Sequence, residues 1–338
     1  MLELVSILVP AYNAEKWISD TIKSALCQTW LKKEVIIVDD GSRDRTLQIA
    51  KRFESKAVKV VTQANSGAGV ARNKALSLAQ GDYIQWLDAD DLLAADKISR
   101  QLENAEDGRK SKTLLSSSYG TFYFCVNRAK LTPNSLWRDL TPIDWMLAKL
   151  MDNAFMIIEG WLVSRQLTEL AGPWNEKLLL DIDGEYFSRV VAASEKVKFV
   201  PEAKCYYRIG NFSSIAGQAN KNLESLLLAT SLSINYLLSL EDSERTRTAC
   251  LRVLQRELPF LYPEKRELLH EINDLANKLG GTLQTPEISW KYYLVKELFG
   301  WKAAKETMSY WARVKTKAKR NWDKLLYDLI CKENLYSP

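Results

Sequence analysis

The sequence predicts an α/β fold, in which helices flank a mixed, mainly parallel sheet and a helical extension follows at the C-terminus. Two observations support this prediction. Strand-like and helix-like segments alternate over roughly the first hundred residues, and such alternation is typical of a parallel sheet covered by helices. From about residue 218 onward, apolar residues recur almost entirely at helical spacing.

The strand-like segments are continuous apolar runs rich in β-branched residues, which is typical of strands buried on both faces. We expect these strands at 4–10, 34–40, 58–63 and 82–88. The segments between them carry apolar residues at steps of three and four, as at Ile18, Ile22 and Ala25. They predict helices at 14–28, 45–53 and 67–79.

The middle region, about 110–212, is less regular. Two helical stretches lie among short strand-like pieces at 121–126, 197–203 and 205–209. Before this region, the residues that follow Asp91 are expected to form a helix that begins near Leu92.

Composition limits the class of protein. A chain of 338 residues, 46% hydrophobic and 26% charged, can bury a large core as one large domain or as a domain with an appendage. The net charge of +5 arises entirely from 301–338, which hold nine Lys or Arg against four Asp or Glu. The uncharged run Ser225–Leu240 is expected to be too short and too polar to span a membrane.

The five cysteines lie far apart, and their spacing suggests neither a zinc site nor a disulfide framework. A reducing, cytosolic compartment fits this pattern best, and the first residues do not resemble a signal peptide. The single histidine, His270, is expected to be structural, so acid–base chemistry must rest on other side chains.

Polar and acidic residues follow three of the predicted strands: Pro10–Asn13, Asp39–Asp44 and Asp88–Asp91. Ligands of such sheets bind beyond the carboxyl ends of the strands, so we expect the three clusters to meet at one edge. Each cluster also has a structural explanation. The second could be a turn and helix start, and the third a helix cap.

A helix cap requires one carboxylate, whereas the third cluster supplies Asp88, Asp90 and Asp91. Converging carboxylates repel each other unless a cation lies between them, and hard divalent cations prefer oxygen ligands. Magnesium usually takes one or two protein carboxylates together with phosphate oxygens. The cluster therefore predicts a metal that is held jointly with a phosphorylated ligand.

A glycine-rich segment, Asn65–Asn73, follows the third strand. Its spacing partly matches a dinucleotide fingerprint, with Asp88 about 20 residues further on. The third glycine of that fingerprint is replaced by Arg72, and the segment follows the wrong strand. A cation beside glycine-rich backbone instead suits a nucleotide or phosphate.

Four segments in order resemble the signatures of the family-2 glycosyltransferases: VSILVPAYNAEKWISDTIKSALCQTW, EVIIVDDGSRDRT, NSGAGVARNKAL and GDYIQWLDADD. They cover roughly residues 4–100. The resemblance implies a GT-A fold and a nucleotide-activated sugar as donor. It implies a GT-A domain over 1–215, with a nucleotide-binding half at 1–105 and an acceptor half at 106–215, and a helical extension over 216–338.

Carried over residue by residue, the resemblance assigns a role to each signature. Pro10, Ala11 and Tyr12 would line the base pocket, and Asp40 would bind the base edge, with Asp39 as a secondary candidate. Arg72 would face the nucleotide. Asp88 would lie towards the ribose and the metal, Asp90 would be the metal ligand for Mg²⁺ or Mn²⁺, and Asp91 would only cap the next helix.

Transfer to an acceptor hydroxyl also requires a general base. The segment GPWNEKLLLDIDGEYFSRVV resembles the acceptor side of the same family, and counting back six residues from Arg189 gives Asp183 as the base. The usual Glu-Asp pair reads Ile182-Asp183 here, so Asp181 and Glu185 remain alternatives. In CYYRIGNFSS, the positions Arg208, Ser213 and Ser214 are further candidate phosphate or acceptor contacts, or parts of a structural strand and loop.

These residues imply a metal-dependent, inverting sugar transfer from a UDP-, GDP- or dTDP-sugar to a glycan or lipid-linked acceptor, in the synthesis of polysaccharide, envelope glycan or glycolipid. The alternative is an inactive partner protein of the same fold. A nucleotidyltransferase is a third and weaker hypothesis, because the first strand is not followed by a basic glycine-rich loop.

The segment 301–329 combines a basic face with apolar residues at helical spacing. Such a helix is typical of a membrane-surface element, which would place the protein in the cytoplasm, on the inner face of the membrane. An ordinary helix packed on the catalytic domain explains the pattern equally well. Nucleic acid is not expected as a partner, because no recognition motif accompanies the charge.

Overall fold

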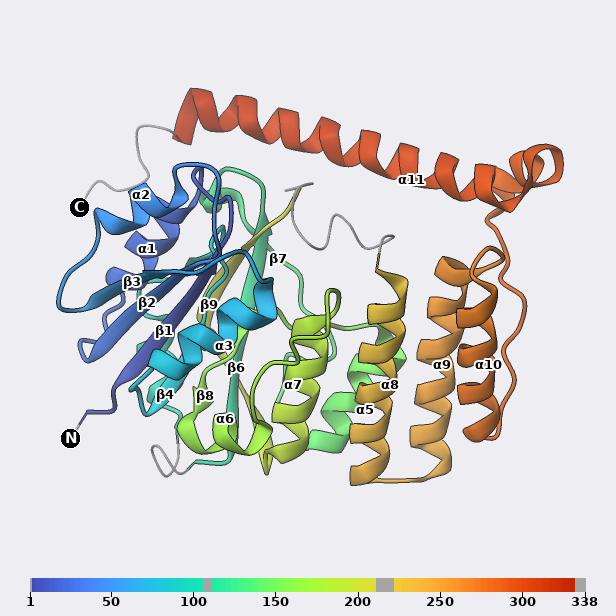
Figure 1. Cartoon of the computed structure of the whole chain (residues 1–338), viewed down its shortest axis with the longest axis horizontal. Coiled ribbons are helices and arrows are strands. Elements are labelled where there is room, and N and C mark those ends of the chain that lie inside the picture. Colours follow the sequence, from blue (N-terminus) through green and yellow to red (C-terminus); the bar gives the residue numbers. More distant parts are fainter. Residues whose placement is uncertain (1, 106–110, 211–221, 332–338) are drawn as a thin grey trace.

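The structure is a computed structural model that describes residues 2–105, 111–210 and 222–331. Its strands form a five-stranded sheet of order β3-β2-β1-β4-β8 and a four-stranded sheet of order β5-β9-β6-β7. Figure 1 shows the sheets on one side of the molecule and a row of helices on the other. The strands are β1 Val5–Ala11, β2 Lys33–Asp39, β3 Val58–Thr62, β4 Tyr83–Trp86, β5 Leu92–Leu93, β6 Thr113–Phe122, β7 Lys130–Leu131, β8 Val163–Ser164 and β9 Lys196–Arg208.

The first sheet confirms the prediction of parallel strands. β1 lies in the centre and pairs in parallel with β2 and β4, and β2 pairs in parallel with β3. Only the short strand β8 is antiparallel, on β4. This order brings the carboxyl ends of β1, β2 and β4 side by side, since Ala11 pairs with Asp39 and Leu8 with Trp86. The three polar clusters therefore do meet at one edge.

The second sheet differs from the sequence prediction. The two pieces expected at 197–203 and 205–209 form one long strand, β9, which runs parallel to β6. The strand expected at 121–126 lies mostly outside β6, which begins earlier and ends at Phe122. The helix expected near Leu92 is also wrong: Leu92 and Leu93 form β5 and pair with β9. Both leucines are buried there, so pairing with a distant strand outweighs the local pattern.

The helices between the first strands lie close to their expected positions, and the middle region holds three helices, α5 to α7, instead of two. Figure 1 shows α7, α8, α9 and α10 side by side and α11 crossing above them. The helices are α1 Ile18–Leu26, α2 Thr46–Lys51, α3 Ala68–Leu78, α4 Lys97–Leu102, α5 Pro142–Asp152, α6 Arg165–Ala171, α7 Ile182–Ala193, α8 Leu223–Leu240, α9 Glu244–Leu261, α10 Arg266–Lys278 and α11 Tyr293–Leu326.

Aromatic rings join the sheet to the helical side. Trp174 stacks on Tyr186 with ring centroids 3.8 Å apart, and its edge meets Trp86 of β4 at 5.0 Å. Trp161 stacks on Phe187 of α7 at 5.1 Å. Because all five rings are buried, this cluster fixes how α7 lies against the strands.

The C-terminal helices pack on the helices of the middle region. α8 packs along α7, and the hydroxyl of Ser225 accepts hydrogen bonds from the backbone of Leu179 and Leu180 at 2.8 and 3.0 Å. By length and composition, α8 is long and apolar enough to cross a membrane, contrary to the expectation for Ser225–Leu240, although 39% of it is buried against protein. The predicted boundary at 215 lies outside the described residues.

The cysteines also differ from expectation in one respect. Cys27, Cys205 and Cys250 are free thiols, as the spacing suggested. Cys125, however, takes part in a disulfide bond. The cysteine spacing alone gave no indication of this bond.

Replacing Trp161 by alanine should destabilise the fold by about 3–5 kcal/mol, because it removes a fully buried aromatic side chain and leaves a cavity. Urea unfolding measured by circular dichroism checks this. The matched control is Trp290→Ala, whose side chain is 81% exposed and which should change the free energy of unfolding by less than about 0.5 kcal/mol. Equal unfolding midpoints for the two variants would contradict the packing described here.

Candidate active site

A cleft of about 1270 Å³ opens at the carboxyl ends of the first sheet and continues between the helices. Every site residue predicted from the sequence lies in its wall: Pro10, Ala11, Tyr12, Asp40, Arg72, Asp88, Asp90 and Asp183. The alternative base Asp181 also lines the cleft, whereas Asp39 and Glu185 do not. Five separate segments of the chain thus converge on one cavity.

Tyr12 and Asp40 form the end of the cleft beside β1 and β2. Tyr12 is 46% exposed and lines the cleft. Asp40 is nearly buried, and its two carboxylate oxygens accept hydrogen bonds from Gln63, Asn65, Ser66 and Gly67 at 2.8 to 3.1 Å. Asp40 therefore orders the loop that leads into α3, a structural role that the sequence did not reveal.

The explanation of 39–44 as a turn and helix start holds only in part. A helix does follow, but α2 begins at Thr46, after Arg45, so neither Asp40 nor Ser42 is its N-cap. Gly41 has φ +69°, and a Cβ there would lie 2.7 Å from the backbone nitrogen of Asn65. Only glycine allows this approach of the two loops.

Asp88 is held by Arg72. The guanidinium lies 3.1 Å from the Asp88 carboxylate, and it also lies over the ring of Trp174 at 4.5 Å from the centroid. Arg72 is only 6% exposed, so its direction is fixed by these two contacts. The predicted Arg72 and Asp88 thus act as a pair at the wall of the cleft.

Asp91 does not cap a helix, which corrects the sequence prediction. It is fully buried, and its carboxylate accepts a hydrogen bond from the backbone nitrogen of Arg208 at 2.5 Å. Burial raises the pKa of Asp91 well above its usual range, and the nearby Glu159 raises it further. The reason for the error is that Asp91 faces β9, which lies far away in the sequence.

Glu159 is the acidic residue that sequence reasoning missed. It lies in the short 3₁₀ helix Ile158–Gly160, is fully buried, and accepts a hydrogen bond from the backbone nitrogen of Asp88 at 3.0 Å. Burial raises the pKa of Glu159 to about 8, with Asp88 adding to the rise. The sequence offers one indication of this role: Glu159 is a single acid within an apolar segment.

The acidic cluster has the chemistry of a divalent metal site. Carboxylate oxygens of Asp88, Asp91 and Glu159 lie within 4.8 Å of one another, and Asp90 lines the same part of the cleft. One oxygen each of Asp91 and Glu159 is buried without a hydrogen-bond partner among the described residues. An all-oxygen donor set with unneutralised charge fits Mg²⁺ or Mn²⁺.

Arg208 holds the acidic turn in place. Its guanidinium lies between the rings of Trp17 and Phe122, at 4.0 and 4.3 Å from their centroids. It donates hydrogen bonds to the backbone oxygens of Asp90 and Tyr123, at 2.8 and 2.9 Å. Arg208 therefore lines the cleft and positions the turn. The other two candidates of this segment, Ser213 and Ser214, lie outside the described residues.

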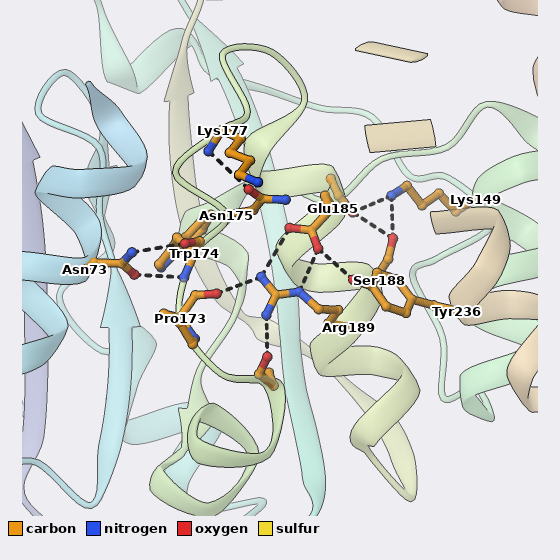
Figure 2. Close-up of polar contacts among 12 residues, drawn as sticks. Asn73, Lys149, Pro173, Trp174, Asn175, Lys177, Glu185, Ser188, Arg189 and Tyr236 are labelled. Atoms are coloured by element: carbon orange, nitrogen blue, oxygen red, sulfur yellow. Dashed lines mark hydrogen bonds and ion pairs between the residues drawn. The ribbon is translucent and has the colours of Figure 1, made fainter. Parts of the chain in front are cut away.

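The three candidate bases have different surroundings, and Figure 2 shows those of Glu185. Glu185 is nearly buried and bound to Arg189, with two contacts of 2.6 and 3.1 Å, and it accepts a hydrogen bond from the hydroxyl of Tyr236 at 3.0 Å. Arg189 also donates to the backbone oxygen of Pro173 at 2.9 Å. Glu185 is thus part of a structural network that joins α7, α8 and the loop before α7.

Asp181 and Asp183 both face the cleft at the start of α7. Asp181 has a left-handed backbone, with φ 52°, and its carboxylate lies where a Cβ of residue 184 would be, so Gly184 is required there. Burial raises the pKa of Asp181 to about 6, against the effect of Lys149. Asp183 lies in the first turn of the helix, where the helix dipole favours a negative charge.

Comparison with known sequences independently supports the family resemblance of the sequence motifs. Residues 6–124 match the profile of Glycosyl transferase family 2. The chain is 33% identical over 219 residues to an uncharacterized glycosyltransferase of Haemophilus influenzae, which covers 63% of this chain and 82% of that protein. It is 39% identical over 123 residues to WfaP of Escherichia coli, named as a UDP-Glc:α-D-GlcNAc-diphosphoundecaprenol β-1,3-glucosyltransferase, over 36% of this chain but only 47% of that one.

Solved structures share the fold. S. aureus TarS 1–349 in complex with UDP-GlcNAc matches with a TM-score of 0.57 and 18% identity, over 81% of this chain and 88% of that chain. The mannosyltransferase PcManGT of Pyrobaculum calidifontis, in complex with GDP-Man and Mn²⁺, matches with a TM-score of 0.54 and 17% identity, over 96% and 88%. At these identities the likeness concerns the fold.

The strand order, the acidic turn at the end of β4 and these relatives together define a glycosyltransferase with a GT-A fold. The chain belongs to glycosyltransferase family 2.

The Glu185→Gln substitution should destabilise the protein by about 3 kcal/mol, because it leaves the largely buried guanidinium of Arg189 without its counter-charge. Chemical denaturation of the full chain measures the effect. Asp183→Asn, two residues nearer the helix start, is the matched control and should change the free energy of unfolding by less than about 0.5 kcal/mol. If Glu185→Gln unfolds at the same denaturant concentration as the control, Glu185 is not the structural anchor described here.

Proposed function

We propose that this protein transfers a sugar from a nucleotide-diphosphate sugar to an acceptor hydroxyl, with inversion at the anomeric carbon and Asp183 as general base. The observation that carries the proposal is the convergence of Tyr12, Asp40, the Arg72–Asp88 pair, Asp90 and Asp183 on one cleft. The solved structures of the same fold include complexes with UDP-GlcNAc and with GDP-Man, which supports a donor of this class.

In this proposal the nucleotide binds over the ends of β1 and β2. The ring of Tyr12 packs on the base, Pro10 and Ala11 form the floor of its pocket, and Asp40 binds its polar edge. Asp88, held by Arg72, reaches the ribose. The diphosphate then lies near Asp90.

Asp90 and Asp88 would hold Mg²⁺ or Mn²⁺, with the carboxyl groups of Asp91 and Glu159 close to that of Asp88. When bound, such an ion supplies positive charge beside the diphosphate that departs. PcManGT, a structure of the same fold, is in complex with Mn²⁺. One carboxylate oxygen each of Asp91 and Glu159, close to Asp88, has no hydrogen-bond partner among the described residues, which supports a cation at this cluster.

The chemical step is a displacement at the anomeric carbon. Asp183 accepts the proton of the acceptor hydroxyl, the hydroxyl oxygen bonds to the anomeric carbon from the side opposite the diphosphate, and the bond to the diphosphate breaks. A base at this position must line the cleft, as Asp183 and Asp181 do and Glu185 does not. Asp183 is preferred because it also matches the motif position six residues before Arg189.

The acceptor is proposed to be a glycan or a lipid-linked glycan of the cell envelope. WfaP, which matches 36% of this chain, is named for transfer to a diphosphoundecaprenol-linked sugar. Seven of the similar proteins, WfaP among them, are matched over less than half of their own length.

The first test concerns the donor and the metal. UDP, GDP or dTDP with Mn²⁺ should raise the melting temperature of the protein, and Asp90→Asn should abolish the part of this shift that depends on Mn²⁺. Differential scanning fluorimetry, with and without EDTA, measures both. Asp96→Asn, an acid on the same segment that pairs with Arg100 on the surface, is the control. If no nucleotide stabilises the protein and Asp90→Asn changes nothing, the proposal fails.

The second test concerns the base. Asp183→Asn should lower the rate of sugar transfer about 100-fold to 10,000-fold, because an amide cannot accept the proton, while the nucleotide-induced melting shift is retained. Asp181→Asn is the matched comparison and should retain most of the activity. A larger loss in Asp181→Asn than in Asp183→Asn would move the base to Asp181. Nucleotide binding without any transfer or donor hydrolysis would favour the inactive-partner alternative.

We also propose that α11 lies on an anionic membrane surface, which would place the protein on the inner face of the membrane. Apolar residues recur at helical spacing along α11, and among them only Ala304 is buried. Trp311, Trp322 and Leu325 are at least half exposed. Eight cations lie between Lys302 and Lys324. Exposed tryptophans beside basic charge complement the headgroups of acidic lipids.

The prediction for α11 is tested by flotation with liposomes. The protein should float with vesicles of phosphatidylcholine and phosphatidylglycerol but not with phosphatidylcholine alone. Changing Lys315, Lys317 and Lys319 to Gln should weaken binding about 100-fold, at about 1 kcal/mol for each charge. A chain that ends before Trp301 should not float. Unchanged flotation of either variant would remove α11 as the anchor, and dimerisation through α11, detected by light scattering, would identify a second copy as its partner instead.

A further inference from the structure

The cleft continues past Asp183 into a pocket between the C-terminal helices, which we call the polar extension. It is formed by the end of α5, the start of α7 and facing turns of α8 and α9. The charged and hydroxyl-bearing residues in its wall are Lys149, Asp181, Thr230, Ser233, Arg256 and Glu257. Apart from Asp181, none of these positions lies in a segment that resembles the family, and the proposed donor site uses none of them.

Two polar side chains of the extension have unused hydrogen-bonding capacity. Ser233 is 4% exposed, and its hydroxyl oxygen has no hydrogen-bond partner among the described residues. The same holds for Oε2 of Glu257, whereas Oε1 accepts a hydrogen bond from the hydroxyl of Thr230 at 2.5 Å. A buried polar group without a partner costs about 1–3 kcal/mol. Two of them in the wall of one cavity indicate a ligand-binding surface.

The charge of the extension is balanced. Lys149 and Arg256 face Asp181 and Glu257, so the net charge is close to zero. Each cation is already engaged with the protein: Lys149 donates to the backbone oxygen of Gly184 at 2.9 Å, and Arg256 to that of Leu150 at 2.9 Å. A neutral molecule with several hydroxyl groups suits this mixture of donors and acceptors.

Aromatic side chains complete the pattern. Phe155 and Phe260 line the same cleft and are 53% and 49% exposed. Sugar rings present apolar C–H faces that pack on aromatic rings, and hydroxyl edges that require hydrogen bonds. An enclosed polar wall beside exposed phenylalanines has both of these properties.

We propose that the polar extension binds the sugar acceptor, with Glu257 and Ser233 bonding to hydroxyl groups that do not react. This inference rests on the proposed function, because it assigns the second substrate to the part of the cleft beyond Asp183. Glu257 and Ser233 then determine acceptor specificity. A site built to bond with a hydroxyl rejects a molecule that lacks it, since the buried group is left unpaired.

The experiment measures binding of p-nitrophenyl glycosides of glucose, galactose and N-acetylglucosamine by saturation-transfer NMR. Titrations use the full chain with Mn²⁺, both with and without the nucleotide that stabilises it. Glu257→Gln and Ser233→Ala should each weaken binding of the preferred glycoside about tenfold, while the nucleotide-induced melting shift stays unchanged. The matched controls are Glu244→Gln on α9 and Ser239→Ala on α8, both exposed outside the cleft, which should bind like the unaltered protein.

The outcomes separate the two proposals. If the nucleotide binds but no glycoside does, or if Glu257→Gln and Ser233→Ala bind glycosides as tightly as the controls, the acceptor site is not in the polar extension and only this inference fails. If no nucleotide binds, the proposed function fails, and the titrations without nucleotide still decide whether the extension holds a sugar. An intact melting curve of Ser233→Ala excludes misfolding as the cause of weaker binding.

Discussion

The contact between Arg208 and the acidic turn is the constraint on which the site depends. Asp88, Asp91 and Glu159 bring several carboxylates into a mostly buried place, and burial of unneutralised charge is costly. Arg208 lies at the end of β9. Its backbone nitrogen donates to the Asp91 carboxylate, its side chain donates to the backbone oxygen of Asp90, and its guanidinium packs on the rings of Trp17 and Phe122. It joins the second sheet to the first where the cleft opens, so the positions of Asp88 and Asp90 follow from it.

Much of the first sheet could be predicted because its signals are local. Each strand is a short apolar run, and each helix has its own apolar spacing. The second sheet could not be predicted in this way. β5 and β9 meet through residues such as Asp91 and Arg208, which are 117 positions apart. Nothing in the two leucines of β5 indicates that partner, and a helix was the better local interpretation.

The candidate site divides along the same line. The sequence motifs identified Asp40, Arg72, Asp88 and Asp183 as candidates. Glu159 lies in no motif, and only the fold brings it to Asp88. The choice among the candidate bases could be made in part from the sequence, because Glu185 and Arg189 have the i, i+4 spacing of a helical ion pair. That spacing already indicates a structural role for Glu185. The difference between Asp181 and Asp183 depends on the shape of the cleft, which a sequence does not carry.

The contact of α8 with α7 has a consequence for how such enzymes diversify. Tyr236 of α8 completes the bonding of Glu185, and Ser225 holds the loop before α7. The C-terminal helices are therefore not an interchangeable module attached to a finished catalytic unit. A chimera that took these helices from a relative would replace one wall of the cleft and, at the same time, the partner of a buried carboxylate. Recombination at this junction must preserve both the cleft wall and the hydrogen bond to Glu185. A change in this wall of the cleft is therefore more readily reached by point substitutions within α8 and α9 than by exchange of the whole segment.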